Sequence, residues 1–142
     1  HSRSMRILGL DIGDRHIGVA VSDPTGIIAT PLATIDRITE PNDIGSILSL
    51  ANYHNVGEIV MGLPLTLAGH FGSQARRGDA FKKKLANVTN IKIQCIDERY
   101  STVEAEKMLR ETRSKRSRGK TTVDAAAACV ILQGYLNSLR LT

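Results

Sequence analysis

The sequence predicts an α/β fold in which a mixed five-stranded sheet carries helices on both faces. Two observations support this prediction. The chain opens with two apolar segments, residues 6–12 and 17–23, joined by "GDRH", which is typical of two strands connected by a tight turn. The later apolar segments alternate with segments of helical spacing, which indicates crossovers between parallel strands.

The first half of the chain supplies a third strand, a helix and a fourth strand. "ATPLATID" at 29–36 predicts the strand. Residues 41–54 predict the helix, because Pro and Asn/Asp stand near its start and apolar residues recur at Ile44, Ile47, Leu48 and Ala51. "GEIVMGLPL" at 57–65 is a continuous apolar run, which suits a central parallel strand covered on both faces.

The second half supplies the remaining elements. We expect a helix over 73–85, a strand over 91–97 rich in β-branched residues, and a short helix over 103–109 after a capping-box pattern. Residues 110–120 are polar and predict a mobile loop. Residues 121–139, "TTVDAAAACVILQGYLNSL", predict a long Ala-rich helix that a threonine can cap.

Length and composition predict a single domain over residues 5–142, with 1–4 as a remnant of an expression tag. Hydrophobic residues make up 42% of the 142 and no apolar run reaches the ~20 residues of a membrane span. Cys95 and Cys129 stand apart in apolar segments, as expected of reduced, buried thiols. We therefore expect a cytoplasmic protein without a membrane partner.

The positive charge is concentrated in one segment. The chain carries a formal charge of +5, and residues 110–120, "RETRSKRSRGK", hold six basic residues against Glu111. Such a segment is either a solvated run of charge or a clamp on a phosphate backbone. We predict a nucleic-acid contact made by Arg99, Arg110, Arg113, Lys115, Arg116, Arg118 and Lys120.

Three acidic residues stand where a carboxylate is costly unless it is used. Asp11 ends the first strand, Glu98 ends the strand "IQCIDE", and Asp124 lies in the first turn of the last helix. Asp124 shares a helix face, expected to point toward the sheet, with Ala128, Ile131, Leu132, Tyr135 and Leu139. If the two strands are near neighbours, the three carboxylates converge.

Converging carboxylates repel one another unless cations bind, and Mg²⁺ or Mn²⁺ with oxygen ligands is the natural partner. Two such ions can activate water and stabilise the leaving oxygen of a phosphodiester. We therefore predict Asp11, Glu98 and Asp124 as catalytic metal ligands. Each also has an ordinary alternative: a turn hydrogen bond for Asp11, an ion pair for Glu98, and a helix-dipole or capping role for Asp124.

Glycines near these acids suggest close approach of a phosphate. Gly13 follows Asp11 after one residue and could leave room for metal or phosphate. Gly69, Gly72 and the helix start at Ser73 could hold a phosphate through backbone amides, or provide loop flexibility alone.

The blocks "LGLDIGDRHIGVAVSD", "VMGLPLTLAGHFGSQA", "IDERYSTVEAE", "SKRSRGK" and "VDAAAACVILQGYL" together resemble the YqgF (RuvX-like) family. The resemblance spans nearly the whole chain. It implies a ribonuclease H-like fold and a metal-dependent nuclease, described either as maturing the 5′ end of pre-16S rRNA or as resolving Holliday junctions. It also implies that the family's acidic set falls on Asp11, Glu98 and Asp124. The run "MGLP" carries no acid where related nucleases have one, so Glu98 must substitute for it.

Two interpretations from other classes remain. "DIGDRHIGVAV" also resembles the first phosphate loop of actin-like and sugar-kinase ATPases. The second interpretation is that the protein is a scaffold that binds nucleic acid without catalysis. The sequence does not decide whether the substrate is RNA or DNA, although we prefer RNA. It also leaves open whether cleavage is endo- or exonucleolytic, and whether the protein is a monomer or a homodimer.

Overall fold

Five strands form one sheet in the order β3-β2-β1-β4-β5. The computed structural model describes residues 5–63, 73–97 and 122–140. The strands are β1 (Arg6–Ile12), β2 (His16–Ser22), β3 (Ala29–Asp36), β4 (Val56–Leu63) and β5 (Lys92–Asp97). The pairs β1/β2 and β2/β3 are antiparallel, whereas β1/β4 and β4/β5 are parallel. The predicted mixed five-stranded sheet is confirmed.

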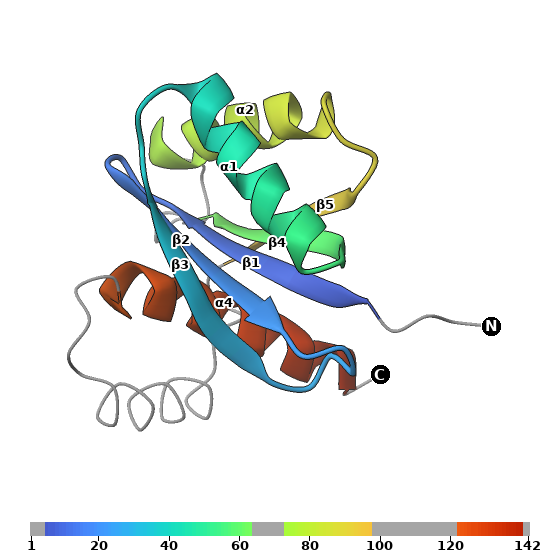
Figure 1. Cartoon of the computed structure of the whole chain (residues 1–142). Coiled ribbons are helices and arrows are strands. Elements are labelled where there is room, and N and C mark those ends of the chain that lie inside the picture. The colour runs from blue at the N-terminus through green and yellow to red at the C-terminus, as the bar shows by residue number, and fades with distance from the viewer. Residues whose placement is uncertain (1–4, 64–72, 98–121, 141–142) are drawn as a thin grey trace.

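Helices cover both faces of this sheet, as predicted (Figure 1). Helices α1 (Glu40–Tyr53) and α2 (Ser73–Ala86) lie on one face, and α4 (Thr122–Arg140) lies on the other. None of the helices among the described residues is long and apolar enough to span a membrane. The helix expected at 103–109 and the loop expected at 110–120 fall outside the described residues.

The alternation of side chains along β1 assigns its residues to two hydrophobic cores. Leu8 and Leu10 are fully buried in the core beneath α1 and α2. Gly9 faces α4 instead, since a Cβ there would lie 2.7 Å from the Cβ of Leu132. Because strand residues alternate between faces, Asp11 lies on the same side as Gly9, toward α4.

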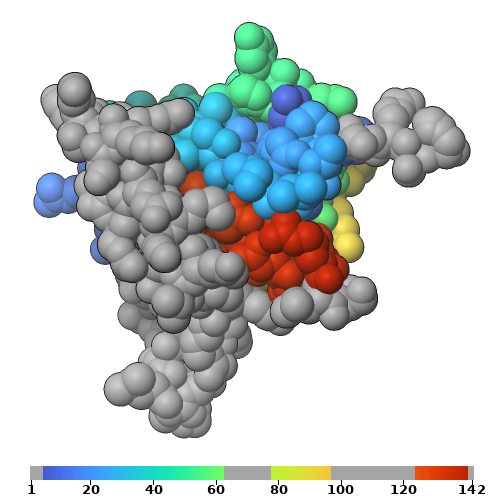
Figure 2. All heavy atoms as spheres, turned by 90° about the horizontal axis from the view of Figure 1, so that it is seen from below, coloured from blue at the N-terminus to red at the C-terminus, as the bar shows by residue number. Residues whose placement is uncertain are grey.

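Helix α4 packs on the sheet through an apolar face that the sequence predicted. Ala128, Ile131, Leu132 and Tyr135 are buried in the second core, together with Ala20 of β2 and Val60 of β4. Figure 2 looks onto this face and shows α4 in red beside the blue atoms of the N-terminal strands. Leu139 was predicted on the same face, but it is 47% exposed because it lies in the last turn of the helix.

Helix α1 begins slightly earlier than the sequence predicts. Thr39 is the N-cap, and its hydroxyl accepts a hydrogen bond from the backbone N–H of Asn42 at 3.3 Å. The helix therefore starts at Glu40, with Pro41 in its first turn, where the missing N–H costs nothing. The chain turns after His54 through Asn55, whose φ of 56° is a left-handed conformation that asparagine tolerates.

The two cysteines are free thiols. Cys129 is buried in the core under α4, and burial raises its pKa to about 11. Cys95 is only partly buried, and burial again raises its pKa. Burial is thus confirmed for Cys129 and only in part for Cys95, which lies on β5 at one edge of the sheet.

Candidate active site

Asp11 and Asp124 come from opposite ends of the chain and meet above one end of the sheet. Asp11 is in β1 and pairs with Gly18 of β2. The backbone carbonyl of Asp124, in the first turn of α4, lies directly over Gly18. Figure 1 shows this arrangement: the β1–β2 hairpin and the first turns of α4 lie at the same end of the molecule. The structure therefore brings two of the three predicted acids together.

The surroundings of Asp11 disfavour a negatively charged carboxylate. Burial raises the pKa of Asp11, and the negative charge of Asp124 raises this pKa further. Both effects disfavour the ionised form of Asp11. A cation bound between the two carboxylates would stabilise their negative charges.

Glycine is required at position 18 for Asp124 to reach this position. A Cβ on Gly18 would lie 1.9 Å from the carbonyl oxygen of Asp124 and 3.1 Å from the backbone nitrogen of Ala125. No side chain fits there without displacing the start of α4. Sequence reasoning missed this role, although a glycine inside the apolar run "IGVAV" is a known signal of close backbone approach.

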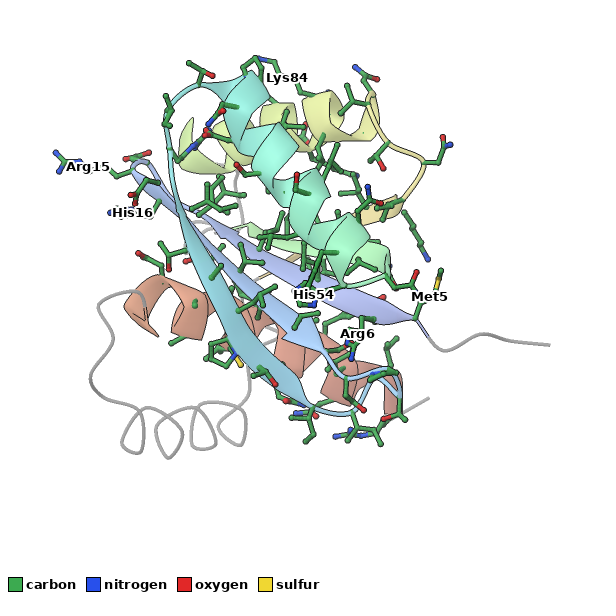
Figure 3. The ribbon with its side chains drawn as sticks, in the orientation of Figure 1. Met5, Arg6, Arg15, His16, His54 and Lys84 are labelled. Atoms are coloured by element: carbon green, nitrogen blue, oxygen red, sulfur yellow. The ribbon has the colours of Figure 1, made fainter. Side chains whose placement is uncertain are left out.

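The turn after Asp11 is tight. The N–H of Gly13 donates to the carbonyl of His16 at 2.9 Å, and a Cβ on Gly13 would lie 2.9 Å from the same oxygen. The turn itself therefore requires a glycine, whereas the expected approach of a phosphate to Gly13 stays a prediction. Figure 3 shows Arg15 and His16 at the tip of this hairpin. Nδ1 of His16 and Oδ1 of Asp36 in β3 are in hydrogen-bond contact at 2.9 Å.

The third predicted acid and all seven predicted nucleic-acid contacts fall outside the described residues, as do two of the glycines predicted to approach phosphate. These are Glu98, Arg99, Arg110, Arg113, Lys115, Arg116, Arg118 and Lys120, together with Gly69 and Gly72. Ser73 is the first residue of α2, as the sequence predicted. Within residues 5–63, 73–97 and 122–140, no group of three or more His, Cys, Asp or Glu side chains could hold a metal.

The sheet topology tests whether the strand that carries Asp11 and the strand that precedes Glu98 are near neighbours. Strands β1, β4 and β5 run parallel, with β4 between the other two. Their carboxyl ends therefore lie at one edge of the sheet, and the strand that precedes Glu98 is a near neighbour of the strand that carries Asp11. The condition of the three-acid prediction, that these two strands be near neighbours, is confirmed, whereas the convergence of all three carboxylates stays a prediction.

The carboxylate of β4 lies away from this edge. Glu58 stands near the start of β4, where it accepts hydrogen bonds from the hydroxyl of Tyr135 at 2.7 Å and from the side-chain amide of Gln94. Burial and the hydrogen bond to Glu58 raise the pKa of Tyr135 to about 12. Glu58 is thus engaged in the packing of α4 and does not substitute for an acid at the end of β4.

Asp23 is a turn residue between β2 and β3. Its carboxylate accepts hydrogen bonds from the backbone N–H groups of Ile27 and Ile28, each at 2.8 Å, and from both the N–H and the hydroxyl of Thr25. Burial pushes the pKa of Asp23 upward, but these hydrogen bonds outweigh it and hold the pKa well below its usual range. The carboxylate shapes the β2–β3 connection.

The sheet order, the helices on both faces and the acid on the central strand define a ribonuclease H-like fold. Comparison with solved structures agrees. Thermus thermophilus RuvC, solved with a Holliday junction substrate, has a TM-score of 0.65 at 12% identity, over 94% of this chain and 96% of that chain. Fowlpox virus resolvase, solved with Holliday junction DNA, has a TM-score of 0.60 at 15% identity, over 95% and 99%.

The chain belongs to the RuvX family. Residues 5–138 match the model of this family, which is described as a Holliday junction resolvase. A protein of Desulforamulus reducens named "Putative pre-16S rRNA nuclease" is 43% identical over 94% of this chain and 98% of its own length. A protein of the same name from Clostridium botulinum is 44% identical over 95% of this chain and 98% of its own length. The family resemblance inferred from the sequence is confirmed.

Proposed function

We propose that this chain is a divalent-metal-dependent nuclease that cleaves a phosphodiester bond at the 5′ end of pre-16S rRNA in the cytoplasm. One observation carries the proposal: two acids from distant elements, Asp11 and Asp124, meet on one face of the sheet, and together with burial this raises the pKa of Asp11. A fold rarely retains such a pair without a use for it, because perturbed acids concentrate at functional sites.

The donor set fits Mg²⁺ or Mn²⁺. Carboxylate oxygens are the preferred ligands of both ions, and a cation would offset the repulsion between Asp11 and Asp124. When bound, two such ions supply a hydroxide-like nucleophile and stabilise the departing 3′ oxygen, which leaves a 5′ phosphate. The protein's own contribution is to keep Asp11 partly buried and close to Asp124, so that ligands are in place before substrate arrives.

Glu98 is the proposed third ligand. It directly follows Asp97, the last residue of β5, and β5 is separated from β1 by β4 alone. Since these three strands run parallel, their carboxyl ends share one edge of the sheet. A third carboxylate from this edge gives the site enough oxygen ligands for two ions, with substrate phosphate supplying the remainder.

Binding of the nucleic acid is assigned to the basic residues. Cationic side chains neutralise backbone phosphates and position the strand, but they carry little sequence information. We propose this role for Arg99, Arg110, Arg113, Lys115, Arg116, Arg118 and Lys120, with backbone approach at Gly13, Gly69, Gly72 and Ser73.

RNA is the first choice of substrate because the curated relatives that match over most of this chain are named for pre-16S rRNA. A four-way DNA junction is the second candidate, since the family's description names Holliday junctions. Cutting a junction symmetrically needs two sites in a dimer, whereas a single-strand nuclease can act as a monomer. Membership of the RuvX family also favours a nuclease over the ATPase that the phosphate-loop resemblance suggested.

The test is cleavage of end-labelled RNA carrying a ribosomal precursor end, beside a labelled four-way DNA junction, with Mn²⁺ or with EDTA. The unmodified chain is compared with Asp11→Asn and Asp124→Asn. The matched control is Asp79→Asn, an acid on α2 that is half-exposed and pairs only with Lys83 at 3.5 Å within the described residues.

Cleavage that needs Mn²⁺, is lost in both site variants and is retained in Asp79→Asn would support the nuclease, and the preferred substrate would identify its target. Binding of RNA without any cleavage would instead favour the scaffold interpretation. Cleavage that persists in Asp11→Asn would contradict the proposed site.

A further inference from the structure

Arg37 lies just after β3 and makes contacts with the turn that follows Asp11. Its Nη1 donates to the carbonyl oxygen of Gly13 at 2.9 Å. Its backbone N–H donates to the carbonyl of Arg15 at 2.9 Å. The turn that closes the β1–β2 hairpin is therefore held at two points by one residue, which directly follows β3. Figure 3 shows this hairpin end, marked by Arg15 and His16, beside the end of β3.

The guanidinium of Arg37 is itself fixed by a buried acid. Its Nε donates to Oδ2 of Asp43 at 3.1 Å, and Oδ1 of Asp43 accepts the backbone N–H of Ile38 at 3.0 Å. Asp43 is 1% exposed and belongs to the first turn of α1. A planar guanidinium can bridge two acceptors in fixed directions, which an ammonium cannot do.

A third element also contacts Arg37. The guanidinium carbon lies 5.3 Å from the ring centroid of Phe81, a buried residue of α2, within the range of a cation–π interaction. Arg37 thus connects the β1–β2 turn to both helices of one layer, α1 through Asp43 and α2 through Phe81.

These contacts act on the backbone that carries Asp11. The ladder between β1 and β2 ends at Ile12, so Gly13 is the first residue beyond it. Asp11 faces α4, whereas Arg37 joins the end of its strand to α1 and α2. The two helical layers thereby fix the end of β1 together: α4 through its approach to Gly18, and the opposite layer through Arg37.

We propose that Arg37 is a positioning residue for the metal-binding carboxylate of Asp11, and that Asp43 orients Arg37 for this role. The proposal rests on the function proposed above. Arg37 touches neither metal nor substrate. It holds the Gly13 carbonyl, so that the strand end carrying Asp11 keeps one position when a cation binds. Direct hydrogen-bond partners of metal ligands change metal affinity by about 10- to 100-fold when they are removed, and we take the lower end of this range for Arg37, which acts through the backbone of Gly13.

The experiment distinguishes a role of Arg37 in positioning Asp11 from a role in protein stability alone. It uses a double variant in which the second substitution removes the unpaired buried charge. Arg37→Gln alone leaves Asp43 buried and unpaired, so it is expected to unfold at lower temperature. The double variant Arg37→Gln with Asp43→Asn removes both charges, and most of that stability should return. Neither variant retains the guanidinium contact with Gly13. Lys84→Gln is the control, because Lys84 of α2 forms an ion pair with Glu40 of α1, the helix that carries Asp43, but is 60% exposed.

Two measurements are made on each protein: Mn²⁺ affinity by electron paramagnetic resonance, and hydrogen exchange of the backbone amides of Gly13 to His16. We expect the folded double variant to bind Mn²⁺ at least 10-fold more weakly than the unmodified chain and to exchange these amides faster. Arg37→Lys should also bind Mn²⁺ more weakly and exchange these amides faster than the unmodified chain. Lys84→Gln should match the unmodified chain in both.

Mn²⁺ affinity within twofold of the unmodified chain in the double variant would overturn the role of Arg37 and leave the proposed function intact. Failure of the unmodified chain to bind Mn²⁺, or binding unchanged by Asp11→Asn, would overturn the proposed metal site and the positioning role with it. The two failures are therefore distinguishable in one series.

Discussion

The backbone carbonyl of Asp124 lies over Gly18, so close that a Cβ on the glycine would come within 1.9 Å of the carbonyl oxygen. Gly18 is paired with Asp11 across the β1–β2 ladder. The first turn of α4 therefore rests on the residue next to Asp11, and this contact brings the two acids into electrostatic interaction.

Gly18→Ala should displace the start of α4 and separate Asp124 from Asp11. Because the added methyl meets backbone, we expect a loss of about 1–3 kcal/mol in the free energy of unfolding. Urea denaturation measures this loss, and Mn²⁺ binding should weaken in parallel. The control is Gly45→Ala in α1, where a Cβ meets nothing within 4 Å and replacement in a helix is expected to stabilise. Equal effects of the two substitutions would contradict the close contact.

Asp11→Asn should stabilise the metal-free protein at neutral pH. The raised pKa of Asp11 means that its contribution to stability is present below the usual pKa of an aspartate and is lost as pH rises through the folded-state value. Asparagine removes this unfavourable charge, so we expect a gain on the order of 1 kcal/mol at pH 7. Thermal unfolding in EDTA from pH 3.5 to 7 would show the gain fading toward acid pH. No gain at pH 7 would contradict the burial of this charge.

Asp124→Asn should lower the pKa of Asp11 without returning it to its ordinary value. Burial is the larger cause of the raised pKa and the charge of Asp124 is the smaller one, so removing the charge leaves the effect of burial. Titration of the Asp11 carboxyl carbon by NMR measures this directly in metal-free protein. An unchanged pKa would mean that the two carboxylates do not interact.

Asp23→Ala should destabilise the protein at neutral pH but not in acid. The hydrogen bonds to Asp23 lower its pKa, so its contribution is present above the usual pKa of an aspartate and is lost as pH falls through the lowered value. We expect the Tm at pH 7 to fall by at most about 2–4 °C, the shift for about 1 kcal/mol in a chain of this size, because solvent screens the charge of this exposed carboxylate. Calorimetry from pH 7 down to pH 2 would show the difference narrowing. A constant difference across this range would contradict the ionic role of the carboxylate.

The secondary structure could be predicted from the sequence because its signals are local. The runs "RILGLDI" and "ATPLATID" are the strands β1 and β3 with unchanged bounds, since apolar and β-branched residues specify a strand through their immediate neighbours. The apolar face of α4 could also be predicted from the spacing of Ala128, Leu132 and Tyr135. It was wrong only at Leu139, where the helix ends and a regular spacing no longer implies burial.

The candidate site could be predicted only in part. Asp11 and Asp124 were found because each is an acid in an otherwise apolar setting, which is visible in the sequence. Arg37 and Asp43 gave no such signal: an arginine after a strand and an aspartate in the first turn of a helix are both ordinary. The hydrogen bonds of Arg37 to Gly13 and to Asp43 exist only once β3 and α1 are placed.

Periodicity and residue type act over a few neighbouring positions, and they are enough to predict the described strands and helices and to identify the costly carboxylates. The meeting of Asp124 with Asp11 follows from the packing of distant segments, since the two residues are far apart along the chain and Gly18 permits the approach of α4. Tertiary packing also decides that Arg37 holds the end of β1 from the opposite layer. Contacts of this kind depend on the backbone separation between packed layers, a quantity that no local pattern encodes.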